Sequence, residues 1–462
     1  MTAKKLRGCL EHAYMLAVCA FLLWDIPYMT EAQWTFDVRG AFPAVWYGLA
    51  VMMLVLSRLR LGALWLPAGL LAWMTASSAY AGVHVLSAQT GALANGVLAF
   101  LVILPAPCIV ERRRMMAWLR FLLAAWTAAF TAQALIGLWA AVTGHAVFSL
   151  KGTWYIGVNL GDNRLYLMAY VTTAAVKLGL SAVLAVTGAA SARGKAGRAA
   201  YLLCALTMLL CLSLTDCRTA FIAVGAALGM MAFVWILHRG GQGTSCPPRM
   251  LRVCCALTAA VVLTVGTYGV LTRLLTAIGP CVQRELNNIN ILELPGELLP
   301  SAAAEAEHAV QHRALEADNL FNDRQLIWSA AVRLLEEHPG FLLTGTTAVH
   351  ASALTNLYVD EAVPLTFAHV HNIYLLTLVS WGIPGFLLLA AALLAFLRAA
   401  WRVMLRRPMP LRWRLAPVPA LYVLLCETVD CYTRLEAGTP MLLYACLFAG
   451  WTLALDRGEA TQ

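Results

Sequence analysis

Charged residues are scarce in this sequence: Asp, Glu, Lys and Arg make up only 12% of its 462 residues, whereas 61% are hydrophobic. A soluble chain of this length carries about twice that charged fraction. The sequence also lacks internal repeats, low-complexity tracts and cysteines paired in a CxxC pattern. These absences argue against a soluble enzyme, a solenoid and the common structural zinc sites.

The hydrophobic residues are gathered in runs of about 17–25 residues, the length that a helix needs to cross the hydrocarbon core of a bilayer. The mean hydropathy of the chain is +0.72. Each run must satisfy its own backbone hydrogen bonds in lipid, so helices are the expected spanning elements. We expect an all-α, polytopic integral membrane protein with about twelve spans, near residues 13–29, 42–58, 61–82, 92–110, 116–142, 165–188, 199–215, 218–237, 252–275, 382–403, 415–430 and 438–455.

The Lys and Arg residues of the connecting segments concentrate on one side of this topology. The positive-inside rule assigns that side to the cytoplasm, so both termini are expected there. The net charge of +9 is therefore interpreted as a topology signal and not as a nucleic-acid-binding surface. The first apolar run follows a basic stretch but lacks a convincing cleavage site, so we expect a retained anchor.

The topology divides the chain into three parts. Residues 1–275 hold about nine spans, residues 276–368 form one large loop outside the cytoplasm, and residues 369–462 hold about three further spans. The loop contains twelve acidic residues and four arginines. Because long loops with their own helices usually carry function, this loop is expected to contribute to an active site.

Within the large loop, the stretch DRQLIWSAAVRLLEEHPG is typical of an amphipathic helix. Its apolar residues recur at helical spacing, at Leu326, Ile327, Ala330, Ala331, Leu334 and Leu335. Asp323 suits the first turn, and Pro339–Gly340 stops the helix. The apolar face must be buried against the membrane domain or the lipid surface.

Two other segments interrupt the apolar pattern. Residues 143–164 are rich in Gly, Asn and aromatic residues and are not expected to form regular structure. Gly382, Pro384 and Gly385 break a later apolar run. This break predicts either a short outer helix over 371–381 followed by a span, or one kinked helix.

Most of the thirteen cysteines lie in the expected spans, where cysteine behaves as a small apolar side chain. Cys281 and Cys431 fall on the outer side and could pair, although the sequence sets no distance between them.

Three residues on the outer side are candidates for chemistry, each with a plainer alternative. Arg218 lies in a tight turn between two spans, where it could be an interfacial anchor or a partner of Asp216. Arg324 begins the amphipathic helix and could be merely solvated. His371 lies where the loop meets the membrane, and could act as a general base or simply cap a helix. Its neighbour His369 gives a weak case for metal.

Acidic residues are a second group of candidates. Glu427 and Asp430 lie near the outer end of the expected eleventh span, where a buried acid is costly and often functional. Either could replace His371 as the base or could orient an arginine.

The order of three short motifs is informative: Cys217-Arg218 entering a span, then RQLIW followed by HPGFLLTG, then HNIYLLTLVSWGIPG. Over roughly residues 150–405 this order resembles the O-antigen ligase and O-antigen polymerase superfamily of bacterial membrane glycosyltransferases. That family typically shows a Ser-Arg turn, an R-x-x-x-W helix closing at His-Pro-x-x-G, and His-Asn before a Gly-x-x-Gly span. Here cysteine replaces the serine, and a Gly-Asn-Pro-Asn-like stretch appears only loosely, as GVNLGDNRLYLMAY.

The resemblance implies a C-type glycosyltransferase-like fold in the bacterial cytoplasmic (inner) membrane, with its active site facing outward. It implies transfer of a glycan from a polyprenyl (undecaprenyl) diphosphate carrier to a hydroxyl of a lipid or polysaccharide acceptor, without metal or cofactor. Arginine forks suit the diphosphate, and a histidine suits the proton transfer. Arg218 and Arg324 would hold the diphosphate and His371 would be the base. The expected substrate-binding residues are Arg164, Arg434, Asn372, Trp328, His369, Glu427 and Asp430.

Two other classes of function stay open. A flippase for lipid-linked oligosaccharides would need repeated halves and charges near the membrane midplane, and the sequence shows little of either. A membrane scaffold or receptor could use the acidic loop to bind a partner. The sequence does not separate a ligase from a polymerase, and it leaves the sugar, the acceptor, the Gram type and the oligomeric state open.

Overall fold

The computed structural model describes residues 3–23, 43–57, 65–145, 147–148, 155–159, 164–167, 171–239, 249–288, 324–359, 369–406, 409–433 and 440–458. The chain divides into two compact units. Unit 1 comprises Met1–Leu22, Asp37–Leu119 and Phe321–Gln462, and unit 2 comprises Leu23–Phe36 and Arg120–Leu320.

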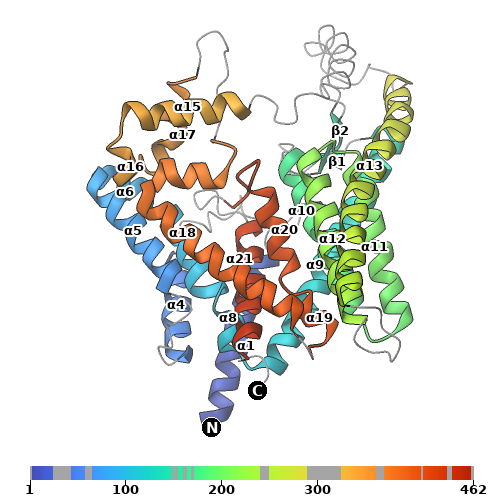
Figure 1. Ribbon diagram of the computed structural model, residues 1–462, viewed down its shortest axis with the longest axis horizontal. Helices are drawn as coiled ribbons and strands as arrows, with labels where there is room; N and C mark the ends of the chain where they lie inside the picture. Colours follow the sequence, from blue (N-terminus) through green and yellow to red (C-terminus); the bar gives the residue numbers. More distant parts are fainter. Residues whose placement is uncertain are drawn as a thin grey trace. The chain divides into compact units, whose positions relative to one another are not determined.

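The described residues of unit 1 form helices joined by turns and short loops, and none of them forms a strand (Figure 1). Its elements are α1 (Ala3–Leu23), α4 (Pro43–Ser57), α5 (Trp65–Ala81), α6 (Val83–Ala88), α7 (Thr90–Gly96), the π-helix η2 (Val97–Ile103), α8 (Ala106–Ile109), α15 (Arg324–Glu337), α16 (Phe341–Thr344), α17 (Ala348–Asn356), α18 (Ile373–Leu405), α19 (Leu411–Arg414), α20 (Val418–Cys426) and α21 (Pro440–Arg457). The chain passes into unit 2 within α9 (Arg112–Thr143).

Unit 2 combines long helices with one small sheet. Its further elements are β1 (Val147–Phe148), β2 (Tyr155–Asn159), β3 (Arg164–Leu167), α10 (Val171–Ser191), α11 (Lys195–Ser213), α12 (Arg218–Arg239) and α13 (Arg249–Asn288).

Seven helical stretches among the described residues are long and apolar enough to cross a membrane: Thr90–Ile109, Arg112–Thr143, Val171–Ser191, Lys195–Ser213, Arg218–His238, Val253–Leu274 and Ile373–Leu405. Apart from the sheet, the all-α architecture expected from the hydropathy is confirmed. The full count of about twelve crossings stays a prediction.

Helices α12 and α13 approach each other closely at two glycines in a G-x-x-x-G pattern. A Cβ on Gly225 would lie 2.7 Å from the carbonyl oxygen of Thr264, and a Cβ on Gly229 would lie 2.6 Å from that of Ala260. The Thr264 hydroxyl also donates a hydrogen bond to the Gly225 carbonyl at 3.3 Å. In lipid there is no hydrophobic driving force between helices, so their association depends on close packing. Small residues at this spacing allow that packing, because they let the two backbones come into contact.

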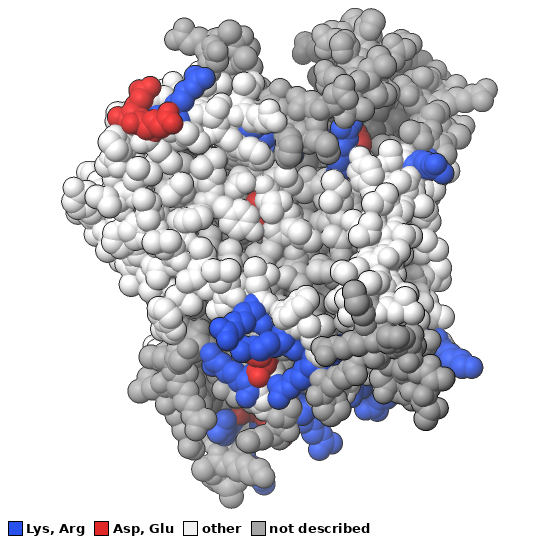
Figure 2. All heavy atoms as spheres, viewed as in Figure 1, with Lys and Arg blue, Asp and Glu red and all other residues white. Residues whose placement is uncertain are grey.

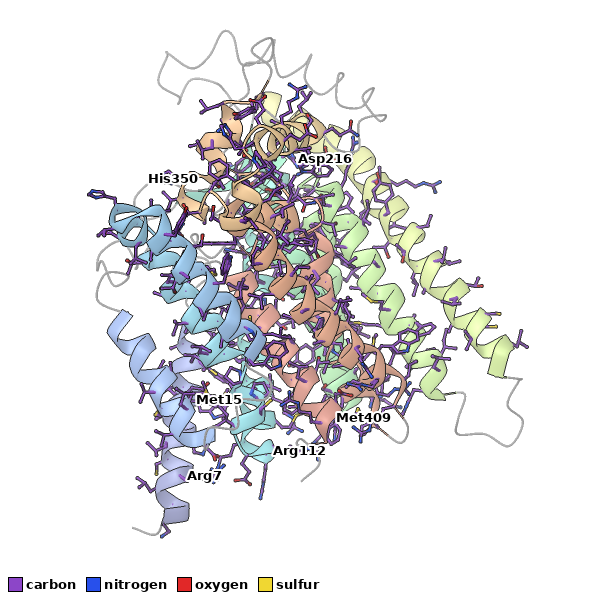
Figure 3. All side chains as sticks on the ribbon, turned by 60° about the vertical axis from the view of Figure 1, so that its left-hand side comes forward. Arg7, Met15, Arg112, Asp216, His350 and Met409 are labelled. Atoms are coloured by element: carbon purple, nitrogen blue, oxygen red, sulfur yellow. The ribbon has the colours of Figure 1, made fainter. Side chains whose placement is uncertain are left out.

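The two ends of unit 1 differ in character. Figure 3 shows His350, in α17, at one end, and Arg7, Arg112 and Met409 at the other. We call these the α17 end and the α19 end. Lys and Arg side chains gather at the α19 end, and a broad, mostly uncharged surface separates them from the charged residues of α15 (Figure 2).

The expectation that residues 143–164 are irregular is wrong, because β1, β2 and β3 form an antiparallel sheet in that order. Ile156 pairs with Leu167, and both are buried together with Leu165. Apolar and more polar residues alternate in β3, which is the pattern of a strand with one buried face. The Gly- and Asn-rich composition of the surrounding segment predicted irregular structure instead. The sixth span, expected from residue 165, therefore begins only with α10 at Val171.

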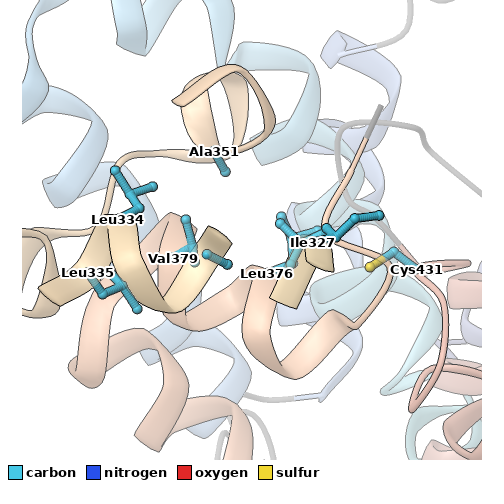
Figure 4. Close-up of a cluster of buried hydrophobic side chains, with 9 residues drawn as sticks. Ile327, Leu334, Leu335, Ala351, Leu376, Val379 and Cys431 are labelled. Atoms are coloured by element: carbon cyan, nitrogen blue, oxygen red, sulfur yellow. The ribbon is translucent and has the colours of Figure 1, made fainter. Parts of the chain in front are cut away.

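The amphipathic helix predicted in the large loop is present as α15. Ile327, Leu334 and Leu335 are buried, as predicted, whereas Leu326 is 39% exposed and does not belong to the apolar face. The buried face packs against α17 and α18 in a cluster shown in Figure 4. Its buried members are Ile327, Ala331, Leu334, Leu335, Ala351, Val370, Leu376, Val379 and Cys431. The apolar face is thus buried against unit 1 itself, which fixes the position of α15.

The predicted break in the run after residue 371 is confirmed as a kink, since Gly382 is non-helical inside α18. The segment after α16 satisfies the backbone groups that the kink frees. The Thr346 N–H donates to the Val379 carbonyl at 2.8 Å, and the Thr347 N–H donates to the Ser380 carbonyl at 2.9 Å. These bonds replace helix hydrogen bonds that lipid could not supply.

Two glycines make this contact possible. Gly345 has φ +73° and Gly382 has φ +65°, in a backbone region that is essentially restricted to glycine. A Cβ on Gly345 would overlap the carbonyl oxygen of Ser380, and one on Gly382 would lie 2.8 Å from the Leu342 carbonyl oxygen. Gly345 therefore leaves room for the backbone just before Gly382, and Gly382 leaves room for the backbone just before Gly345.

Helix α5 supports the same contact from a third side. The Trp73 indole N–H donates to the Trp381 carbonyl at 2.7 Å, and the Ser77 hydroxyl donates to the Thr344 carbonyl at 2.5 Å. Trp381 also packs into a small core with Leu70, Leu71 and other residues of α5. The kink, α5 and the α16–α17 segment thus form one hydrogen-bonded assembly.

Gly345→Ala and Gly382→Ala should each lower the free energy of unfolding by about 1–3 kcal/mol, because alanine is strained at these torsions and its methyl group collides with backbone. Thermal unfolding of the detergent-purified protein measures the loss. Gly340→Ala is the matched control, since a Cβ there meets no atom within 4 Å. Equal melting temperatures for all three variants would show that the contact does not hold the kink.

Candidate active site

Asp430 is the centre of a cluster of polar side chains in unit 1. It is 3% exposed, and its Oδ1 lies 3.1 Å from His369 Nε2 and 3.1 Å from His371 Nδ1. Its Oδ2 lies 3.5 Å from Nη2 of Arg324. The Cys431 backbone N–H donates to Oδ1 at 2.8 Å. One carboxylate therefore faces two imidazoles and one guanidinium.

Three segments that are distant in sequence supply these residues. Arg324 is the first residue of α15, the two histidines precede α18, and Asp430 lies in the turn that follows α20. The apolar cluster under α15 brings the first two segments together, because Ile327 and Leu334 pack with residues of α18.

Asn372 connects the histidine segment to the Asp430 turn. As the N-cap of α18, its side-chain oxygen accepts from the backbone N–H groups of Tyr374 and Leu375, at 3.0 Å each. Its side-chain amide donates to the Thr428 carbonyl at 2.9 Å. Capping by asparagine satisfies free N–H groups at a helix start. It also fixes the preceding residue, His371, which adopts a left-handed backbone with φ +53°.

Trp328 lies one helical turn after Arg324 on α15, so both side chains project from the same face. The indole N–H of Trp328 donates to the Val370 carbonyl at 3.1 Å, between the two histidines. The R-x-x-x-W spacing therefore serves two contacts at once. The tryptophan holds the backbone of the histidine segment, and the arginine reaches the carboxylate that the histidines also face.

The surroundings of Asp430 stabilise its charged form. Burial raises the pKa of this carboxyl, but the hydrogen bonds with His369 and His371 outweigh burial and hold the pKa below its usual range. Asp430 is therefore ionised at neutral pH. Because Nδ1 of His371 faces this carboxylate, Nε2 is the ring nitrogen that remains for a substrate, as in other acid-oriented histidine bases.

Glu427, three residues before Asp430, has the opposite environment. It is 1% exposed in the turn after α20, and its Oε1 accepts from the Tyr432 backbone N–H at 3.1 Å. Burial raises the pKa of Glu427 well above its usual range, despite hydrogen bonds from Thr433 and Tyr432 that lower it. The two acids, which sequence alone treats as equivalent, thus have pKa values that their surroundings move in opposite directions.

His369, His371 and Asp430 are also a possible metal site by geometry. Their potential ligand atoms all lie within 4.8 Å of one another. However, Arg324 already places a permanent positive charge 3.5 Å from the same carboxylate, and like charges repel strongly in a buried site. The contacts fit a hydrogen-bonded cluster better than a cation site, and independence of metal stays a prediction.

Arg218 and Arg164 lie in unit 2. Arg218 begins α12, two residues after Asp216, whose backbone is left-handed with φ +46°. Arg164, at the start of β3, donates from Nε to the Thr215 carbonyl at 2.8 Å and from Nη2 to the Asp216 carbonyl at 2.9 Å. Arg164 therefore holds the turn that presents Arg218.

The structure describes only some of the remaining candidates from the sequence. Arg434 lies outside the described residues. The proposed pairing of Cys281 with Cys431 also falls outside them, because the side chain of Cys281 is not described, whereas Cys431 is buried in the cluster under α15. The structure thus brings together Arg324, His369, His371 and Asp430.

The raised pKa of Glu427 predicts a pH dependence of stability. The folded protein holds the proton of Glu427 more tightly than the unfolded chain does. The stability gained from this proton is therefore fully present below the unfolded pKa of about 4.3, and it is lost as the pH rises through the folded pKa. Glu427→Gln keeps a neutral group of the same shape. Relative to wild type, its melting temperature should therefore improve as the pH rises above the unfolded pKa of about 4.3.

Exposed Glu336 on α15 offers the control for this experiment, since Glu336→Gln removes a carboxylate in contact with solvent. Its melting curve should follow that of wild type at every pH. Parallel pH profiles for wild type and Glu427→Gln would contradict the assigned environment.

Comparison with curated proteins found no match. A family model described as O-antigen ligase matches residues 203–390. The matched range contains Arg218, Arg324 and His371, and it ends before Asp430. It also contains the HPGFLLTG and SWGIPG segments that meet at the kink of α18. Residues 203–390 of this multi-pass membrane protein therefore carry a domain of the O-antigen ligase family, the family that the order of the sequence motifs predicts.

Proposed function

We propose that the protein transfers a glycan from a polyprenyl diphosphate carrier to the hydroxyl of an acceptor during synthesis of a surface polysaccharide. The family match supports lipid-linked glycan transfer as the class of reaction. The contact of His371 Nδ1 with the buried carboxylate of Asp430, at 3.1 Å, is the observation that carries the residue assignment.

In the proposed reaction the acceptor oxygen attacks the anomeric carbon of the donor. The bond between that carbon and the diphosphate oxygen breaks, and the diphosphate leaves with the electron pair. The acceptor proton passes to Nε2 of His371, and Asp430 stabilises the imidazolium that forms. Direct displacement of this kind inverts the anomeric centre.

The leaving diphosphate needs cationic partners. Planar guanidinium groups bind phosphate oxygens in pairs and keep their charge at all working pH values. We assign this role to Arg324 beside the His371–Asp430 pair and to Arg218 from unit 2, with Arg164 positioning the turn that carries Arg218. Arg434 is a further candidate.

The contacts of the other candidates favour positioning roles. Trp328 and Asn372 each hold the backbone beside His371. His369 shares Oδ1 of Asp430 with His371 and so restricts the orientation of the carboxylate. Glu427 supports the same turn through the Tyr432 N–H.

We further propose that the site faces outward from the bacterial cytoplasmic membrane, with both termini in the cytoplasm. The distribution of Lys and Arg between the connecting segments supports this orientation. The donor lipid diphosphate would then reach the site from the outer leaflet.

His371→Ala should lower kcat for glycan transfer by about 10²–10⁴-fold with little change in KM, because a general base acts only in the transition state. Purified protein, a polyprenyl-diphosphate glycan and an acceptor are sufficient for the assay. Asp430→Asn should show a smaller loss of the same kind. His338→Ala is the control, since His338 is an exposed histidine of the large loop that contacts Tyr358. Transfer by His371→Ala at the wild-type rate would refute the base assignment.

Arg324→Ala and Arg218→Ala should each lower kcat/KM for the donor by at least about 10²-fold, since both remove a charge that stabilises the departing diphosphate. Arg324→Lys should recover only part of the loss, because lysine cannot form two parallel hydrogen bonds.

Arg333→Ala, on an exposed position of α15, controls for loss of positive charge in the acidic loop. If wild-type protein moved the donor between leaflets without covalent transfer, a flippase would replace the proposed enzyme. If Arg218→Ala alone kept full activity, unit 2 would not contribute to diphosphate binding.

A further inference from the structure

Arginines are concentrated at the α19 end of unit 1, in and beside the segment that connects α18 with α20. Residues 398–414 contain six arginines and no acidic residue. Arg112, the first residue of α9, and Met409, two residues before α19, lie at this same end of the unit (Figure 3). Like charges gathered in this way repel each other unless anions or water offset them.

Two guanidinium groups share the indole of Trp413 in α19. The guanidinium carbon of Arg112 lies 3.7 Å from the centroid of the ring, and that of Arg412 lies 5.7 Å from it. Both distances are in the range of cation–π contacts. One aromatic ring thus holds two positive charges from different helices, α9 and α19, close together.

The carboxylates of nearby elements are engaged by other arginines. Asp456, in α21, forms an ion pair with Arg402 of α18 at 2.5 Å. Glu111, which precedes α9, forms one with Arg114 at 3.2 Å. Among the residues that the structure describes, no carboxylate lies within ion-pair distance of the two guanidinium groups at Trp413. Their charges are therefore not balanced by acidic side chains of the described chain.

Two N–H groups of the same cluster are buried without an acceptor in the described part of the chain, Nε of Arg412 and Nε1 of Trp413. Buried donors are nearly always hydrogen-bonded, because an unpaired one costs its full desolvation penalty. The next residue, buried Arg414, holds α19 against α18, since its Nε donates to the Met404 carbonyl at 2.6 Å. The two donors therefore belong to an element that is fixed in place.

The chemistry of these groups fits a phosphate, and their position fits that of a lipid. A phosphate has several oxygen acceptors and a negative charge, and arginine forks bind its oxygens in pairs. Arg112 begins and Leu405 ends two helices that are long and apolar enough to cross a membrane, so the cluster lies at the depth of lipid headgroups. Trp401, near the end of α18, is 56% exposed, as is typical of tryptophan at the membrane interface.

We propose that Arg112, Arg412 and Trp413 bind the phosphate of an anionic phospholipid in the membrane leaflet at the α19 end. The phosphate oxygens accept from the two buried donors, and the negative charge offsets the two guanidinium groups. Basic pockets between the ends of membrane helices bind anionic headgroups in this way. The bound lipid joins the start of α9 to α19. This site is independent of the proposed glycan transfer, because it needs no glycan donor and lies at the opposite end of unit 1 from α17 (Figure 3).

Native mass spectrometry of the detergent-purified protein with phosphatidylglycerol and phosphatidylcholine tests this proposal. Wild-type protein should retain phosphatidylglycerol in preference to phosphatidylcholine. Arg112→Gln and Arg412→Gln should each weaken binding of phosphatidylglycerol by at least about fivefold. Trp413→Phe keeps an aromatic ring but removes one donor, so it should weaken binding by at least about twofold. Arg113→Gln is the matched control, because Arg113 is exposed, adjoins Arg112 and carries the same charge.

Arg412→Lys keeps the charge but removes the fork and its Nε donor, so it should bind with intermediate affinity and keeps the test valid if the glutamine variants do not fold. Equal binding of phosphatidylglycerol by wild type and the folded variants would overturn the proposal. An equal loss in Arg113→Gln, or equal retention of both lipids by wild type, would overturn it as well. Inorganic phosphate distinguishes a free anion from a lipid. If it raised the melting temperature of wild type but not of Arg412→Gln, and phosphatidylglycerol did not, the assignment to a lipid would be wrong.

Discussion

A buried, ionised carboxylate has to be paired, because an uncompensated charge in an apolar interior is among the costliest features a fold can contain. Asp430 meets this requirement with three segments at once: the start of α15 through Arg324, the residues before α18 through His369 and His371, and its own turn through the Cys431 N–H. If any one of these segments moved away, the carboxylate would lose part of its pairing. The carboxylate therefore joins the start of α15 to the residues before α18 and to the turn after α20.

Backbone hydrogen bonds make the second connection, between the segment after α16 and helix α18. A helix broken inside a bilayer exposes carbonyl groups that lipid cannot satisfy. In α18 the carbonyls of Val379 and Ser380 accept from Thr346 and Thr347, on the segment that follows α15 and α16. The kink is thus stable only while that segment is in place. The contact thus joins the chain that follows α15, which begins with Arg324, to the helix that follows His371.

Much of this architecture is predictable from the sequence, and the exceptions have physical causes. Helical periodicity predicted α15, and the Gly-Pro-Gly pattern predicted the break at Gly382, because both signals are local. The small sheet in unit 2 was missed because its strands are short and separated by Gly- and Asn-rich segments. The choice between Glu427 and Asp430 was also out of reach. Both are acids three residues apart, and only the tertiary contacts of Asp430 with histidines separate them.

The same contacts give a reason for two arginines in the proposed mechanism. The guanidinium of Arg324 already faces the carboxylate of Asp430, so part of its charge is offset before any substrate arrives. A diphosphate leaving group develops negative charge that one partly neutralised cation cannot balance in a site of low dielectric. The proposed mechanism therefore calls for a second cation, and we propose Arg218, which is presented by a turn that Arg164 holds. In the proposed mechanism, Asp430 thus orients His371 and also offsets part of the charge of Arg324.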